Sequence, residues 1–480
     1  MSIRSWFATK AVNFLASNNR TEGWETSLSR ARPSSSLVSN DQEYNYGNRE
    51  KMMAEARALC QTFGIASNIL GKYANYCVGS CEVDFNTGNP DWDELAEETV
   101  RQLFETIDVS GENNLAGMAK MGIKSKKRDG DVGFIKTLDN GFPQIQAIEA
   151  DRIRANPFPF NSDFDKTFIG GVKVGRTGRP LSFKVWERQL YMGFENPREI
   201  EASSFIFLKE KSRFDGIRGV TAFERGALNH MRDIKEIIAA EKKAVKVAGK
   251  WAVLIKRFAG GKPVSSVNLF GPKTDGTGNN YSEEVQDGLI KYLLPGEDAS
   301  SFQSNRPSPT FQGFLEFLIR DIAVSLELPV GFVWSLLGLT GPSVRLESKQ
   351  AEKTFQAEIE QLERTFLNPL CAWVITWAMM ESKRLPFNPY WYKFEFNRPS
   401  HPSIDVGRES KADLDELAAC VTSEVDLSAE RGRNAFRTLK KKARFAQAVL
   451  ATAKEFGVPV EMLKEPPKQQ PPAPQQQEEP

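Results

Sequence analysis

The sequence predicts an α+β fold, because helical and strand-like segments occupy separate stretches of the chain. Apolar residues recur at helical spacing in residues 49–128, whereas residues 131–208 hold short apolar runs divided by turns rich in Gly and Asn. Two long helical patterns, 221–250 and 310–327, flank a segment rich in Gly, Pro, Ser and Asn. This order indicates a mixed domain, a long helix pair carrying a small insertion, and a helical C-terminal part.

The composition excludes several classes of protein. The 480 residues are 40% hydrophobic and 26% charged, which permits a sizeable core and argues against global disorder. Lys+Arg is 63 and Asp+Glu is 62, so the net charge of +1 argues against a globally basic nucleic-acid coat. Five Cys and no signal-like N-terminus predict a reducing compartment. No apolar run reaches the roughly 20 residues of a membrane-spanning helix.

The first half of the chain opens with a polar arm, residues 1–48, which we expect to be ordered only by a partner. Apolar spacing then predicts one helix over 49–78, ended by Gly79, a second over 91–107 and a third over 112–128. Asp139-Asn140-Gly141 between two apolar runs predicts a hairpin of 132–138 with 143–148. A second hairpin pairs 168–174 with 181–186, and 203–208 is a further strand.

The second half is predicted from the same signals. A helix covers 221–250, a strand 251–255, a small helix 282–290 and another helix 310–326. After a loop at 328–342, a helix starts near Ser343, polar at first and apolar from 359 to 380, with a kink near Pro369. A strand over 389–397 and helices near 408–420, 427–441 and 442–456 follow. The Pro/Gln/Glu-rich residues 465–480 are expected to be disordered.

The signals for catalysis each have a simpler structural interpretation. Residues 170–177 nearly fit the phosphate loop GxxxxGK[ST], but Arg176 replaces Lys and a strand follows, which favours a hairpin. A metal-dependent nuclease site could be formed by Asp129, Asp131, Glu149 and Asp151. Such sites usually also have a nearby Lys in a strand, which is absent here, so we interpret these residues first as acids of turns and solvated strand edges. Cys77 and Cys81, with Cys60 upstream, lack a fourth zinc ligand. With only His230 and His401, we predict no enzyme, cofactor or metal.

Basic patches are the remaining candidates for binding. They lie at 120–128, at 242–257 and over 431–444, and each is interpreted first as a solvated helical face and second as a phosphate-binding face. They lack the interleaved aromatic residues of single-strand binding.

Several segments, in order, resemble the lambda-type portal proteins of tailed double-stranded DNA bacteriophages. They are residues 59–79, Glu149-Ala150-Asp151-Arg152-Ile153, Gly171-Val172 with Gly178-Arg179-Pro180, Arg218-Gly219-Val220, Pro295-Gly296-Glu297, and residues 309–328. Arg345 stands where this family has an Arg at the start of the helix after the loop, although the loop itself departs from the family pattern. The resemblance spans roughly residues 50–420.

The resemblance implies a portal-type fold that assembles into a ring, usually a dodecamer. Its first parts would be an arm (1–48), a wing (49–220), a stem helix (221–250), a clip (251–309) and a second stem helix (310–327). A tunnel loop (328–342), a long helix returning to the wing (343–400), a crown (401–464) and a tail (465–480) would follow.

The function that it implies is a portal, the head–tail connector through which viral double-stranded DNA is packaged, retained and ejected. Implied partners are other copies of the chain, DNA bound without sequence specificity, the terminase large subunit, scaffold and major capsid proteins, and tail connectors. The location would be the virion, after assembly in the host cytoplasm. A metal-dependent nuclease and a virion adaptor without a channel remain the alternatives.

The candidate channel residues belong to two sets. The first comprises the tunnel loop and the following helix start, Trp334, Leu336, Leu337, Leu339, Ser343, Arg345 and Lys349. The second is the basic face of the stem helix, Lys242, Lys243, Lys246 and Lys250.

Overall fold

A computed structural model describes most of the chain, in two compact units. The first unit comprises Met1–Ile69 and Thr221–Leu339, and the second Leu70–Val220 and Thr340–Pro480. Apart from Ser39, Asp41 and Tyr44, the described residues are 46–155, 168–188, 193–224, 226–248, 252–256, 282–285, 288–293, 311–334, 340–400 and 406–460. The predictions for the arm, the tail at 465–480 and most of the clip therefore lie outside the described residues, as do those for Lys250, Leu336, Leu337 and Leu339.

The first unit is built on a long helix pair. The 3₁₀ turn η3 (Ala222–Glu224) leads into α7 (Ala227–Ala248), which packs against α3 (Tyr46–Thr62) and α8 (Phe311–Ser325). Leu228, Met231 and Ile234 of α7 are buried, as are Leu318 and Ile322 of α8. Both predicted long helices are confirmed, although α7 begins at Ala227 and not at 221, because Gly226 takes a φ of 88°. A short helix, α9 (Val330–Val333), follows α8.

Between α7 and α8 the chain forms a small three-stranded sheet. β11 (Gly288–Leu293) pairs in parallel with β9 (Ala252–Lys256) and antiparallel with β10 (Ser282–Val285). The strand predicted at 251–255 is confirmed, but the helix predicted at 282–290 is wrong. Backbone pairing of β11 with β10, and with β9 about 35 residues earlier in the chain, overrides the local helical preference of this segment.

The helix predicted over 49–78 is also wrong in one respect, because α3 ends at Thr62 and α4 (Gly64–Cys77) begins after Phe63. The Thr62 hydroxyl donates to the Ala58 carbonyl oxygen at 2.8 Å, and Gly64 is a poor helix former. Gly79 does not act as a left-handed cap. A Cβ there would lie 3.1 Å from the Pro399 backbone, so the residue is small because the chain passes close by.

The second unit contains two stacked sheets. The first has the order β3-β2-β8, with β2 (Asp131–Asp139), β3 (Phe142–Glu149) and β8 (Phe205–Lys209) all antiparallel. The second has the order β4-β5-β6-β7, with β4 (Phe168–Ile169), β5 (Val172–Val174), β6 (Pro180–Arg188) and β7 (Phe194–Glu201). Ile135, Ile148, Val172, Phe183 and Phe205 form part of the apolar cluster between them.

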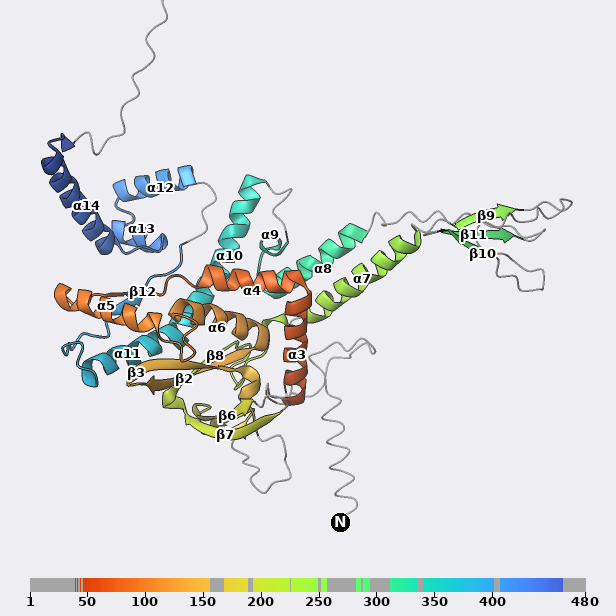
Figure 1. The fold of residues 1–480 in the computed structure, drawn as a ribbon, viewed down its shortest axis with the longest axis horizontal. Helices are drawn as coiled ribbons and strands as arrows, with labels where there is room; N and C mark the ends of the chain where they lie inside the picture. Colours follow the sequence, from red (N-terminus) through yellow and green to blue (C-terminus); the bar gives the residue numbers. More distant parts are fainter. Residues whose placement is uncertain are drawn as a thin grey trace, which may run out of the picture. The chain divides into compact units, whose positions relative to one another are not determined.

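Helices cover the other face of the first sheet (Figure 1). One is α6 (Leu115–Asp129), which contacts β2 and β8. The other is the continuation of α10 (Gly341–Leu362), which runs through a π-helical turn, η4 (Glu363–Leu367), into α11 (Asn368–Met380). The predicted kink near Pro369 is therefore a π turn, which fits a Pro that cannot donate to the carbonyl four residues earlier.

Predicted strands in this unit are partly confirmed. The first hairpin turns at Asn140 and Gly141, with φ of 49° and 81°, as Asn-Gly predicts. The strand predicted at 168–174 is instead two strands, β4 and β5, because Gly170 and Gly171 take φ of 56° and 87°. The sequence did not predict β7, most of whose residues are exposed.

The remaining elements are short strands and helices. The Asn89 side chain caps the N-terminus of α5 (Pro90–Glu105), close to the start predicted at 91. β1 (Val83–Phe85) pairs with β12 (Phe394–Phe396), which is much shorter than the predicted strand 389–397 because a turn at Asn388 and Pro389 precedes it. The C-terminal helices are α12 (Val406–Ala418), α13 (Glu424–Glu430) and α14 (Ala435–Phe456). The boundary predicted at 441–442 is wrong, since α14 runs through it.

Candidate functional site

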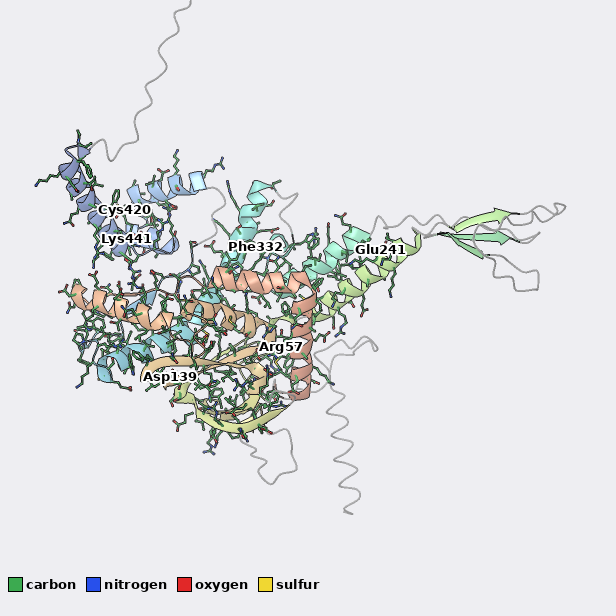
Figure 2. All side chains as sticks on the ribbon, in the orientation of Figure 1. Arg57, Asp139, Glu241, Phe332, Cys420 and Lys441 are labelled. Atoms are coloured by element: carbon green, nitrogen blue, oxygen red, sulfur yellow. The ribbon has the colours of Figure 1, made fainter. Side chains whose placement is uncertain are left out.

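The predicted tunnel loop starts as folded structure. Gly331, Phe332 and Val333 of α9 are buried, and Phe332 is labelled in Figure 2. Trp334, directly after them, is 56% exposed. The prediction of a loop beginning at 328 is therefore wrong for its first turn, which anchors on the core of the first unit. Residues 335–339 lie outside the described residues.

The start of α10 presents the other predicted channel residues. Thr340 precedes the helix, Pro342 occupies its first turn, and the hydroxyls of Thr340 and Ser343 lie 2.9 Å apart. Lys349 is exposed, Ser343 and Arg345 are half-buried, and Leu346 is 61% exposed. The first turns of α10 are thus hydrated, and its core contacts begin at Ala351. The polar start predicted for this helix is confirmed.

The first unit carries cations and apolar side chains on its two long helices. Lys242, Lys243 and Lys246 are exposed along α7. Phe314, Phe317 and Val324 of α8 are 51–69% exposed, at spacings of three and seven residues that place them on one helical face. This face, here called the α8 apolar stripe, points away from the packed face formed by Leu318, Ile319, Ile322 and Ala323. Contiguous exposed apolar surface often marks an interaction site, whereas single exposed apolar residues are common.

The acids of the nuclease hypothesis do not converge. The Asp131 carboxylate is fully buried and accepts two bonds from Arg218, 2.7 Å from Nε and 2.8 Å from Nη2. Glu149 and Asp151 instead bind Arg188, whose pKa is raised by its hydrogen bond to Asp151. Asp129 pairs with Arg128. The interpretation of Asp131 as a solvated turn acid is also wrong, since the residue is part of a buried ion pair.

Arg218 is the centre of a clasp that joins segments far apart in the chain. Besides Asp131 it donates to the backbone oxygens of Ala150, Ile153 and Gly170. The N–H of Gly219 donates to Asp131 Oδ2 at 3.0 Å. A Cβ on Gly219 would lie only 1.9 Å from the Gly130 carbonyl oxygen, so no larger residue fits there. Sequence reasoning recorded these segments as separate motifs and missed that they share one buried guanidinium.

Part of the basic patch at 120–128 is a buried ion cluster. Lys126 Nζ lies 2.5 Å from Glu358 of α10 and 2.7 Å from Gln361, and Lys127 Nζ lies 2.8 Å from Glu358 and 3.0 Å from Glu210. Lys126 is fully buried and Lys127 nearly so, so the solvated-face interpretation is wrong for both.

Mutual attraction keeps this cluster charged. Burial alone would lower the pKa of Lys127, but Glu210 and Glu358 outweigh it and raise that pKa. Burial would likewise raise the pKa of Glu358, yet Lys127 and Lys126 hold it below its ordinary value. The nearby Tyr73 hydroxyl has its pKa raised by burial. The cluster therefore ties α10 to α6 and to the residue after β8.

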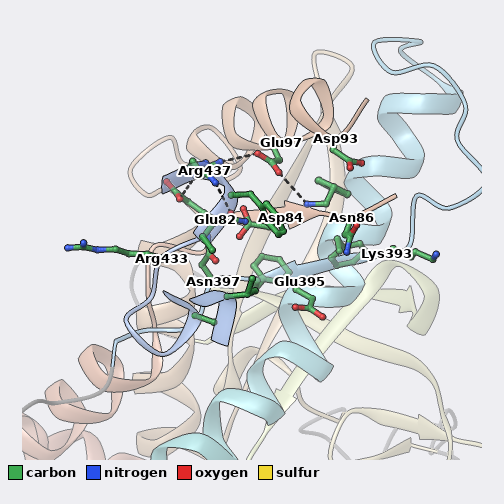
Figure 3. A pocket seen from close by; sticks show the side chains of 18 of the residues that line it. Glu82, Asp84, Asn86, Asp93, Glu97, Lys393, Glu395, Asn397, Arg433 and Arg437 are labelled. Atoms are coloured by element: carbon green, nitrogen blue, oxygen red, sulfur yellow. Dashed lines mark hydrogen bonds and ion pairs between the residues drawn. The ribbon is translucent and has the colours of Figure 1, made fainter. Parts of the chain in front are cut away.

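The patch at 431–444 faces acids across a groove of about 1680 Å³ (Figure 3). Arg437 of α14 lies 2.5 Å from Glu82 and 3.3 Å from Glu97. Lys440 lies 3.1 Å from Glu94, and its hydrogen bond and charge lower the pKa of that carboxyl. The pKa of Glu97 is raised, mainly by burial. This part of the patch is occupied by carboxylates of the same chain rather than free for phosphate.

The cysteines show no ligand geometry. Cys77 and Cys81 are buried, and burial raises the pKa of Cys81 to about 12. Among the residues that the structure describes, no group of three or more His, Cys, Asp or Glu side chains could hold a metal ion. No described helix combines the length and apolar character needed to cross a membrane.

Comparison with known proteins assigns the family. A family model described as "Phage portal protein, lambda family" matches residues 25–335, well over half of the chain. The chain belongs to the lambda family of phage portal proteins. The match ends before α10, so it leaves Arg345 and the C-terminal helices uncovered.

Solved structures similar to this portal-family chain come from gene transfer agent (GTA) particles. The neck of an empty GTA particle, computed with C6 symmetry, has 12% identity and a TM-score of 0.45, covering 79% of this chain and 94% of that chain. The virion of a native GTA particle has 12% identity and a TM-score of 0.43, covering 80% and 98%. No curated protein matches.

Membership of the portal family accounts for several features of the second unit. The resembling motifs at 149–153 and 218–220 meet at the Arg218 clasp, which also binds Gly170, directly before the motif Gly171-Val172, so they have a structural basis here. The family is one of structural proteins, which agrees with carboxylates that are engaged by Arg rather than gathered around a reaction site.

Proposed function

We propose that this chain assembles into a closed ring around a channel for double-stranded DNA at one vertex of a capsid. The observation that carries the proposal is membership of the portal family over residues 25–335. Such a portal passes DNA inward during packaging, retains it and releases it at infection. Energy for translocation then comes from a terminase ATPase docked on the ring, since the chain itself supplies no phosphate loop.

The long helices support an assembly of this kind. The α8 apolar stripe, Phe314, Phe317 and Val324, needs an apolar partner, and a neighbouring copy provides one in a ring. Ring contacts join unlike surfaces of successive copies, so the partner surface is elsewhere on the chain. In this arrangement α7 and α8 form the stem and β9–β11 belong to the clip. Residues 49–220, with 343–400 returning, form the wing, and α12–α14 form the crown.

The channel face is proposed from exposed residues of both sets. Lys242, Lys243 and Lys246 on α7, with Lys250 beyond the described residues, give the channel a weak attraction for phosphates. A small number of phosphate contacts suits this role, because affinity for DNA rises with each phosphate that is neutralised. Many contacts would bind the DNA too tightly for it to slide. Trp334, Leu336, Leu337, Leu339, Ser343, Arg345 and Lys349 are proposed to meet the DNA at the tunnel loop and helix start.

The other proposed partners follow from the portal role. They are scaffold and major capsid proteins during head assembly, and tail connectors afterwards, with assembly in the host cytoplasm and the finished ring in the virion. A dodecamer is the proposed subunit number.

Electron microscopy of the purified chain tests the ring directly. Closed rings with an axial hole are expected, whereas a protein that stays monomeric at every concentration, alone and with its capsid scaffold, would refute the proposal. The channel is tested by replacing residues 336–341 with a short Gly-Ser link. Rings should persist while DNA packaging or retention falls, and unchanged packaging would show that the loop does not meet DNA.

A further inference from the structure

The C-terminal helices expose more apolar surface than they bury. Among the side chains that the structure describes in residues 407–460, the buried apolar residues are Leu427, Val449 and Ala453. Eight large apolar side chains there are 46–72% exposed, namely Leu414, Val421, Val425, Phe436, Leu439, Phe445, Leu450 and Phe456. A segment of this size with so small a core gains little from folding by itself. Its stability therefore requires a further surface to cover these side chains.

Most of the exposed set on α14 lies on one face. This face begins at Phe436 and continues with Leu439, Ala443 and Leu450, which lie three, seven and fourteen residues after it. Such spacing is typical of a helix that packs along its length against another helix. The face of α14 that carries Arg437, Lys440 and Arg444 is different and turns toward the acids of the groove. Val449 and Ala453 occupy a third, buried face. The first face, here called the α14 apolar stripe, is thus distinct from the two faces already in use.

Charge divides the same segment into two opposite halves. Residues 406–430, which hold α12 and α13, carry seven carboxylates and two cations, a net charge of −5. α14 carries six cations and one carboxylate, a net charge of +5. Arg437, Lys440 and Arg444 pair with acids of the groove, whereas Lys441, Lys442 and Lys454 are not among those pairs. Lys442 follows Leu439 by three residues and Lys454 follows Leu450 by four, so a cation lies beside each of these two apolar residues of α14. Asp415, Glu416 and Glu424 are exposed on the acidic half.

We infer that the α14 apolar stripe of one copy packs on the acidic α12–α13 half of the next copy, so that the C-terminal helices form a head-to-tail belt. Opposite charges on one segment favour this occupant, because each copy offers the surface that its neighbour lacks. Leu414, Val421 and Val425 supply apolar contact on the acidic half. Unlike surfaces meet, as a cyclic ring requires. The inference rests on the ring of the proposed function and assigns one of its contacts.

The first test measures hydrogen exchange of α14 in rings of the full chain. In the double variant L439E/L450E, peptides from α14 should exchange roughly tenfold or more faster than in wild-type rings, since two buried contacts are lost. Phe445→Glu is the matched control, because Phe445 is equally exposed but lies off the stripe. Equal exchange in all three proteins would overturn the belt, and so would a control that loses as much protection as the double variant.

A second test needs no destabilising change. Exposed Cys420 marks the acidic half, so Lys442→Cys on α14 can be linked to it by a flexible bis-maleimide, with Cys60→Ser in every protein. A ladder of covalent multimers that disappears when Cys420→Ser is added is expected. A ladder that survives Cys420→Ser, or linkage within monomers alone, would overturn the inference, as would α14 protection that arises only when scaffold protein is added. Absence of wild-type rings would instead refute the proposed function.

Discussion

Removing the Asp131 carboxylate should destabilise the second unit severely. Arg218 is 5% exposed, and Asp131 → Ala leaves its guanidinium with backbone carbonyl partners but no counter-charge. The N–H of Gly219 also loses its acceptor. Breaking a buried ion pair from one side costs about 3–5 kcal/mol. For a unit of this size each kcal/mol lowers Tm by roughly 2 °C, so a fall of roughly 6–10 °C is expected.

The assay is thermal and urea unfolding of the full chain, followed through the transition of the second unit. Asp139→Ala is the matched control, because Asp139 ends the same strand at an exposed turn, and its effect should stay within about 0.5 kcal/mol. The double variant D131A/R218M should be less destabilised than the sum of its single variants, because it removes the orphaned charge. If Asp131→Ala costs no more than Asp139→Ala, the buried-pair argument is refuted.

Three further predictions concern charge. Because the pKa of Glu358 is lowered in the fold, the ionised carboxylate stabilises the protein at neutral pH, and this stabilisation is lost as the pH falls through that pKa. The difference in free energy of unfolding between wild type and Glu358→Gln should therefore shrink on acidification. A difference that stays constant would contradict this. The variant Arg437→Ala at low salt should show faster amide hydrogen exchange in α14, by about as much as 1 M salt accelerates it in the wild type. If exchange in the wild type does not depend on salt, the ion pairs of Arg437 with Glu82 and Glu97 do not hold α14 in place. DNA should stay intact with Mg²⁺ or Mn²⁺; cleavage abolished by Asp151→Asn would revive the nuclease.

Local chemistry made part of the fold predictable from the sequence. The turn at Asn140 and Gly141 needs positive φ at both residues, which this pair tolerates, so the hairpin follows from two neighbouring residues. The N-terminus of α5 follows from Asn89 and Pro90 in the same way. The long helices α7 and α8 follow from apolar spacing within each segment.

The sequence also carried the family, through short motifs in a fixed order. It did not reveal what those motifs do in space. Asp131 and Arg218 stand 87 positions apart, and nothing local distinguishes this buried acid from Asp139 at an exposed turn. Lys126 and Glu358 stand 232 positions apart, so a run of lysines at a helix end was taken for a solvated face.

The strands at 282–293 illustrate the same limit for secondary structure. Their residues favour a helix locally, and only the pairing of β11 with β10 and with β9 makes them strands. Thus the sequence determined the turns, caps and amphipathic helices, whose energies arise within a few residues. The tertiary structure decided which charges are buried and paired, which acids stand apart from one another, and which apolar faces stay exposed, because each depends on contacts between segments that only the folded chain brings together.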